Sequence, residues 1–174
     1  MKKLSVISLI FSLLFVFSCE DKVEKDKTSP TIFFRTFGET NNNVVGVSVQ
    51  QTKDDGYIIL GSEYDGKDKS FLLKTDPNGI QEWNKKYGDG FPSSVEQSID
   101  GGYVFLKNVY NDGTLIKVDS LGNEQWNKSL NGKGESIRQT SDGGWIITGS
   151  KNGSKILLIK IDSQGNEEWN KTFG

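Results

Sequence analysis

The chain has 174 residues and a net charge of −2, and it contains one cysteine and no histidine. These two counts exclude a disulfide framework, histidine-ligated zinc sites and Ser-His-Asp triads. A 34% share of hydrophobic residues, with 20 glycines and only 3 prolines, predicts a folded domain, and the slight negative charge argues against nucleic acid as a partner.

Residues 1–18 have the pattern of a secretory signal peptide. Lys2 and Lys3 precede an apolar run over 4–17, which is too short to span a bilayer. The string Val-Phe-Ser-Cys at 16–19 resembles the lipobox of bacterial lipoproteins, in which the cysteine is acylated and becomes the new amino terminus. The resemblance implies lipid attachment at Cys19 and a cell-envelope location, on the outer membrane and facing either the periplasm or the outside. A secreted soluble protein with an incidental cysteine is the alternative.

Residues 19–30 are predicted to be the acylated cysteine and a charged tether. Seven of the eleven residues over 20–30 are charged, and one is apolar. Such a segment cannot bury enough apolar surface to fold by itself. After loss of the signal peptide, the chain would contain 19 basic and 23 acidic residues, which gives a net charge of −4.

An internal repeat occupies the rest of the chain, over 31–174. Trp83, Trp126 and Trp169 are 43 residues apart in each interval, and each is followed by Asn-Lys. A period in the low forties is that of a four-stranded propeller blade, whereas helical repeats of this length would show a 3.6-residue apolar periodicity that this chain lacks.

Each unit contains four short runs of β-branched and aromatic residues separated by Asp, Asn and Gly, which are strand and turn signals. In the third unit these signals predict strands over 136–140, 145–149, 156–161 and 166–173.

An Asp-x-x-Gly turn precedes the last strand of every unit. The Asp side chain can accept hydrogen bonds from turn amides, and the glycine can take a positive φ. We therefore interpret these residues, with the tryptophans, as structural and assign no metal, cofactor or catalytic role to them. The turn residues are Asp76, Asp119, Asp162, Gly79, Gly122 and Gly165.

The segments ending at the three tryptophans resemble the tryptophan-docking repeats of pyrroloquinoline-quinone-type propellers, in which the tryptophan packs between blades. The Asp-Gly-Gly-Tyr/Trp hairpins also resemble repeats of bacterial surface proteins. Both resemblances cover 31–174 and imply the fold without implying a quinone site. The hairpins are also similar to the Asp-boxes of sialidases, but those enzymes use three arginines on the substrate carboxylate, and this chain has only Arg35 and Arg138.

The predicted architecture is an all-β, propeller-like chain of three four-stranded blades, over about 39–88, 89–131 and 132–174. One extra strand over 31–38 precedes them, because 33–38 matches the last strand at 169–174. Closed propellers have four to eight blades. The favoured hypothesis is thus an incomplete part of a longer propeller, with a six-bladed ring of two copies or an open solenoid as alternatives.

These patterns favour a non-catalytic binding or scaffolding module, anchored to a membrane through Cys19, with a protein or glycan ligand on the propeller rim. The alternative is part of a glycan-cleaving or quinone-dependent propeller enzyme whose catalytic residues lie outside this chain.

Overall fold

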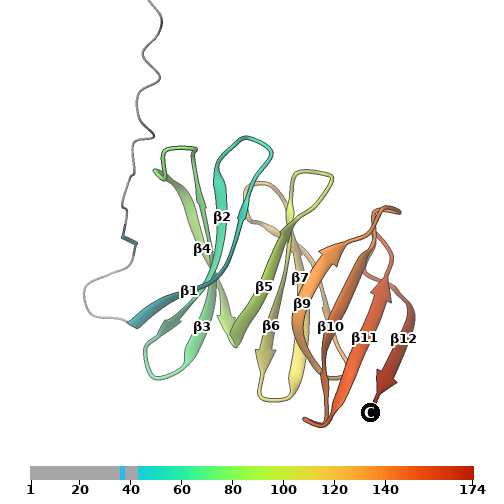
Figure 1. The fold of residues 1–174 in the computed structure, drawn as a ribbon. Coiled ribbons are helices and arrows are strands. Elements are labelled where there is room, and N and C mark those ends of the chain that lie inside the picture. Colours follow the sequence, from blue (N-terminus) through green and yellow to red (C-terminus); the bar gives the residue numbers. More distant parts are fainter. Residues whose placement is uncertain (1–35, 38–42) are drawn as a thin grey trace, which may run out of the picture. The chain divides into compact units, whose positions relative to one another are not determined.

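The structure is a computed structural model that describes residues 36–37 and 43–174, and twelve strands in this part form three antiparallel sheets (Figure 1). The first sheet consists of β1 (Asn43–Gln51), β2 (Tyr57–Tyr64), β3 (Asp68–Thr75) and β4 (Gln81–Asp89). The second consists of β5 (Phe91–Gln97), β6 (Tyr103–Val109), β7 (Asp112–Val118) and β8 (Glu124–Ser129). The third consists of β9 (Lys133–Gln139), β10 (Trp145–Lys151), β11 (Lys155–Ile161) and β12 (Glu167–Phe173).

Every sheet is a meander in which neighbours in sequence are neighbours in space. The predicted all-β, propeller-like fold with three four-stranded blades is therefore confirmed. Of the predicted extra strand over 31–38, only Thr36 and Phe37 are described, and neither belongs to a strand. None of the residues that the structure describes lies in an apolar helix of membrane-spanning length.

The first strand of each sheet carries a β-bulge at the same place. Pairing with the second strand skips Val47 in β1, Ser93 in β5 and Glu135 in β9. A bulge bends the strand and turns the unpaired residue away from the regular pleat. The three sheets thus share a backbone irregularity at positions where their side chains differ.

The sheets pack face to face in series, with the second between the other two (Figure 1). Strand β5 contacts β1, β2 and β3, and β9 contacts β5, β6 and β7. The first strands β1, β5 and β9 are therefore the inner strands, side by side, as in a propeller.

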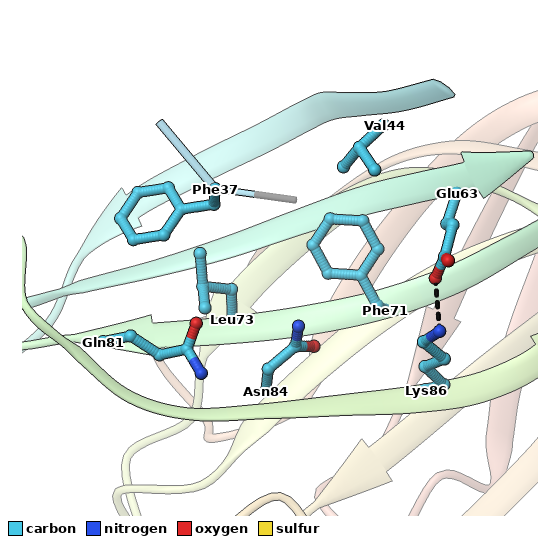
Figure 2. A pocket seen from close by; sticks show the side chains of 8 residues that line it. All are labelled: Phe37, Val44, Glu63, Phe71, Leu73, Gln81, Asn84 and Lys86. Atoms are coloured by element: carbon cyan, nitrogen blue, oxygen red, sulfur yellow. Dashed lines mark ion pairs between the residues drawn. The ribbon is translucent and has the colours of Figure 1, made fainter. Parts of the chain in front are cut away.

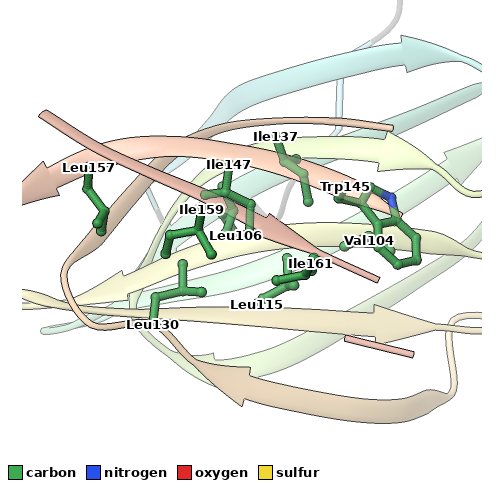
Figure 3. Close-up of a cluster of buried hydrophobic side chains, with 10 residues drawn as sticks. All are labelled: Val104, Leu106, Leu115, Leu130, Ile137, Trp145, Ile147, Leu157, Ile159 and Ile161. Carbon is green, nitrogen blue, oxygen red and sulfur yellow. The ribbon is translucent and has the colours of Figure 1, made fainter. Parts of the chain in front are cut away.

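Two separate hydrophobic cores fill the two seams between sheets, and the alternation of β6 supplies both. Tyr103 and Phe105 point into the first core, whereas Val104 and Leu106 point into the second. Figure 3 shows the second core, in which Ile137, Ile147 and Ile159 of the third sheet meet the second sheet. Because both faces of the second sheet are covered, four consecutive residues are buried in each of its central strands, over 103–106 in β6 and 115–118 in β7.

Candidate functional site

The three repeated tryptophans lie on the last strand of each sheet, and two of them close a seam. Trp83 in β4 packs across to the second sheet, with its ring centroid 5.9 Å from that of Tyr103. Trp126 in β8 makes the matching contact with Trp145 in the third sheet, at 6.1 Å. The same two positions of the repeat therefore form both seams.

The glycine of each Asp-x-x-Gly turn lies under the tryptophan of the preceding sheet. Gly122 and Gly165 have φ values of 77° and 80°. A Cβ on Gly122 would lie 3.0 Å from the Trp83 ring, and one on Gly165 would lie 2.8 Å from the Trp126 ring. Both the positive φ and the missing space require glycine. Gly79 takes the same conformation, with φ of 72°, in the first sheet.

The aspartates of these turns hold the backbone. One carboxylate oxygen of Asp76 accepts from the N–H groups of Asn78 and Ile80, both at 2.8 Å. Asp119 and Asp162 make the same two bonds at 2.8–2.9 Å. In both of these turns, the backbone hydrogen bond from the residue after the glycine is the main reason that the pKa of the carboxyl is lowered. The charge of each carboxylate is thus used to fix a turn.

Two polar contacts join the tryptophan strand to the next turn at the first seam. The Tyr87 hydroxyl donates to the Gly122 carbonyl at 2.8 Å, and Lys85 Nζ donates to Asn123 Oδ1 at 2.6 Å. Burial raises the pKa of Tyr87 above its ordinary value. The tyrosine therefore keeps its proton and serves as a hydrogen-bond donor across the seam.

The inner strands are connected by a repeated serine. Ser48 Oγ accepts from the Val95 backbone N–H, and Ser94 Oγ accepts from the Ile137 N–H, both at 3.3 Å. Ser136 occupies the same place in β9, directly after the bulge. This contact was missed from the sequence, although the serines recur at one position of the repeat.

A buried lysine from the third strand of each sheet reaches the first hairpin turn of the same sheet. In the sequence, this lysine is found two residues before the Asp of each Asp-x-x-Gly turn. The nitrogen–oxygen distances are 2.8–2.9 Å for the pairs Lys74–Asp54, Lys117–Asp100 and Lys160–Asp142.

This lysine explains the glycine that precedes the aromatic residue in each hairpin. A Cβ on Gly102 would lie 2.5 Å from Lys117 Nζ and 2.3 Å from the Val118 carbonyl. Gly56 and Gly144 are equally crowded. The Asp-x-Gly-aromatic hairpin thus binds the buried lysine of the same sheet. This contact explains why the Asp-x-Gly-aromatic pattern recurs in every repeat.

Trp169 is the one repeated tryptophan that no described sheet covers. Its side chain is 40% exposed, and the Lys171 ammonium lies 5.6 Å from the ring centroid. Phe173 on the same strand is 50% exposed. The outer face of β9–β12 is therefore an uncovered half of a seam.

A cavity of about 270 Å³ lies on the opposite end of the series, on the outer face of the first sheet (Figure 2). Its apolar side is made by Phe37 above Leu73 and Phe71, and the Lys86–Glu63 ion pair closes its polar side at 2.5 Å. Phe37 is 37% exposed. Thus one residue from the segment before β1 rests on this face.

Another cavity, of about 400 Å³, lies over the inner strands, and we call it the inner-strand pocket. It is the place where residues of all three sheets meet at their bulges. Its lining consists of Val47, Phe91, Pro92, Ser93, Asn108, Tyr110, Lys133 and Glu135.

Hydrogen bonds fix the wall of the inner-strand pocket between the second and third sheets. The Asn108 side chain exchanges two bonds with the Gly134 backbone, each of 2.9 Å, and Ser93 Oγ donates to the Gly134 carbonyl at 2.6 Å. The pocket is therefore set in a rigid frame even though it is open to solvent.

Tyr110 is the least ordinary residue of the inner-strand pocket. It is 91% exposed and has a φ of 54°, which is rare for a bulky side chain. Phe91, at the start of β5, is also exposed. Sequence reasoning missed this site because it depends on which residues depart from the repeat, whereas the repeat itself drew attention to the turns.

Cys19, the predicted lipid attachment site, lies outside the described residues. Within the part of the chain that the structure describes, no group of three or more His, Cys, Asp or Glu side chains has the arrangement of a metal site.

The geometry defines a propeller-like repeat protein with two closed seams and an open pocket over its inner strands. No family model and no curated protein matches the sequence. The fold is similar to a crystal structure of a protein of unknown function from Bacteroides caccae, with a TM-score of 0.55 at 10% identity. The match covers 74% of this chain and 46% of that protein, so this chain spans about half the length of that protein.

Proposed function

We propose that this chain is a non-catalytic binding or scaffolding module of the cell envelope, held at a membrane by a lipid on Cys19. The observation that carries the binding role is the inner-strand pocket, where exposed aromatic residues depart from an otherwise repeated structure. Residues shared by all three sheets serve folding, so a ligand site is expected where the sheets differ.

The chemistry of the inner-strand pocket supports a protein or glycan ligand. Tyr110 and Phe91 offer flat apolar faces, and Lys133 and Glu135 add one cation and one anion beside them. Large aromatic side chains that keep a polar handle are common at recognition surfaces. The open form of the pocket suits part of an extended ligand.

Binding can be tested with a panel of immobilised oligosaccharides and peptides. For any ligand found, Tyr110→Ser is expected to weaken the affinity about tenfold, because an aromatic contact contributes about 1 kcal/mol beyond its buried area. Tyr64→Ser is the matched control, since Tyr64 is also exposed but does not line the pocket. Equal affinities for the two variants would mean that the ligand does not bind in the inner-strand pocket. Turnover of the ligand would favour the alternative that the chain is part of an enzyme.

Lipid anchoring can be tested separately in cells. Cys19→Ser removes the thiol that would carry the acyl chains, so the protein is expected to move from the membrane fraction to the soluble fraction. Ser18→Ala is a suitable control, because it keeps a small residue before the cysteine. Continued membrane retention of Cys19→Ser would contradict the proposed anchor while leaving the ligand site untouched.

A further inference from the structure

The outer face of β9–β12 carries residues equivalent to those that form the two closed seams, and none of the described sheets covers it. Trp169 corresponds to Trp83 and Trp126 by the 43-residue period. Ser136 corresponds to Ser48 and Ser94, which accept inter-sheet hydrogen bonds. Phe173 and Ile156 are 50% and 60% exposed on the same sheet. The equivalents of the seam residues and the exposed apolar side chains therefore lie on one face, which we call the third-sheet face.

The two closed seams show which groups of a partner sheet contact such a face. At the first seam the partner sheet offers Gly122 under the tryptophan and the Val95 N–H to the serine. At the second seam Gly165 and the Ile137 N–H do the same. A partner therefore needs a glycine of positive φ in an Asp-x-x-Gly turn, and a free N–H on an inner strand.

We infer that the third-sheet face is a docking surface for a further blade of the same repeat. The described blades are joined by very short connections, because only Gly90 separates β4 from β5 and three residues separate β8 from β9. The end of β12 occupies the same place in its sheet as the ends of β4 and β8. The third-sheet face thus continues an established series of interfaces.

A second copy of the chain fits this face less well. It would have to present the outer face of its first sheet, and Phe37 already rests there above Leu73 (Figure 2). Phe37 corresponds to Phe173 in the match between 33–38 and 169–174. The Phe173 side chain of an incoming copy would therefore compete with Phe37 for one position. A blade joined after β12 meets no such competition.

The test is to extend the full chain, in mild detergent, with a second copy of residues 132–174 after Gly174. Docking of the added blade is expected to raise the thermal unfolding midpoint by about 5 °C or more, since each repeat interface adds to the stability of a stacked array. The added blade should also resist limited proteolysis. An unchanged midpoint, with proteolytic trimming back to Gly174, would overturn the inference.

Trp169→Ala supplies the specific readout in both lengths of the chain. It should lower the midpoint only slightly in the 174-residue chain, where the ring is exposed, and should remove most of the gain in the extended chain. A matched control is Gly165→Leu in the added copy alone, which fills the space that Trp169 needs. Equal effects of Trp169→Ala in the two lengths would overturn the inference. Self-association of the 174-residue chain that Trp169→Ala abolishes would also overturn it, in favour of a second copy.

Discussion

Among single residues, glycines with the same backbone conformation differ in what surrounds them. Gly165 and Gly143 have φ values of 80° and 84°. A Cβ on Gly165 would lie 2.8 Å from the Trp126 ring, whereas a Cβ on Gly143 would have no neighbour within 4 Å. Comparing the two positions separates backbone strain from packing at the seam.

Gly143→Ala is expected to lower the free energy of unfolding by about 1–2 kcal/mol, the cost of a left-handed conformation. Gly165→Ala should cost about 1–3 kcal/mol more, because the tryptophan must shift. Urea unfolding curves of the two variants give the difference. Equal losses would mean that the turn glycines are kept for φ alone and that the tryptophan does not need the space.

At the scale of the element, the first hairpin of each sheet depends on an ion pair. The hydrogen bond from Lys74, followed by that from Thr52, lowers the pKa of Asp54 from 3.8 to about 2. Lys74 is buried, whereas the Asp54 side chain is 58% exposed, so solvent screens the interaction. The pair should therefore affect the pH dependence of stability modestly but measurably.

The direction in which stability changes with pH follows from proton linkage. Because the pKa of Asp54 is lower in the folded state, its contribution is complete above pH 3.8 and is lost as the pH falls through about 2. We expect the urea midpoint to fall in this window and the fall to be shallower for Asp54→Asn. Asp55→Asn, in the same turn but outside the ion pair, is the control. A fall of unchanged steepness in Asp54→Asn would contradict the assignment.

The elements also show what the sequence could reveal. The last strand of the third unit was predicted over 166–173 and is found at Glu167–Phe173. The first was predicted from residue 136, whereas β9 begins at Lys133, because pairing resumes beyond the bulge at Glu135. Period-2 patterns cannot show a strand that continues past an unpaired residue.

The inner-strand pocket could not be predicted for a different reason. Its residues come from strands about forty positions apart, and only the packing of β1, β5 and β9 brings Val47, Phe91 and Glu135 together. The seams were easier to predict from the sequence, because a tryptophan repeated every 43 residues already implied a repeated contact. Local signals thus defined the blades, and long-range packing defined the candidate site.

At the scale of the whole described part, three sheets with two cores behave as a short one-dimensional array. The second sheet belongs to both seams, through residues that are neighbours on β6: Phe105 faces the first core and Leu106 the second. Each core is otherwise built from different side chains. Local opening of one seam should therefore leave the other largely intact.

Phe105→Ala and Leu106→Ala test this arrangement by removing large buried side chains, each at a cost of about 2–5 kcal/mol. Native-state hydrogen exchange is expected to accelerate mainly in β2 and β3 for Phe105→Ala, because these strands share its core. For Leu106→Ala the acceleration should fall on β10 and β11. Uniform acceleration across all three sheets in both variants would mean that the array opens only as a whole, and the nearest-neighbour description would then be wrong.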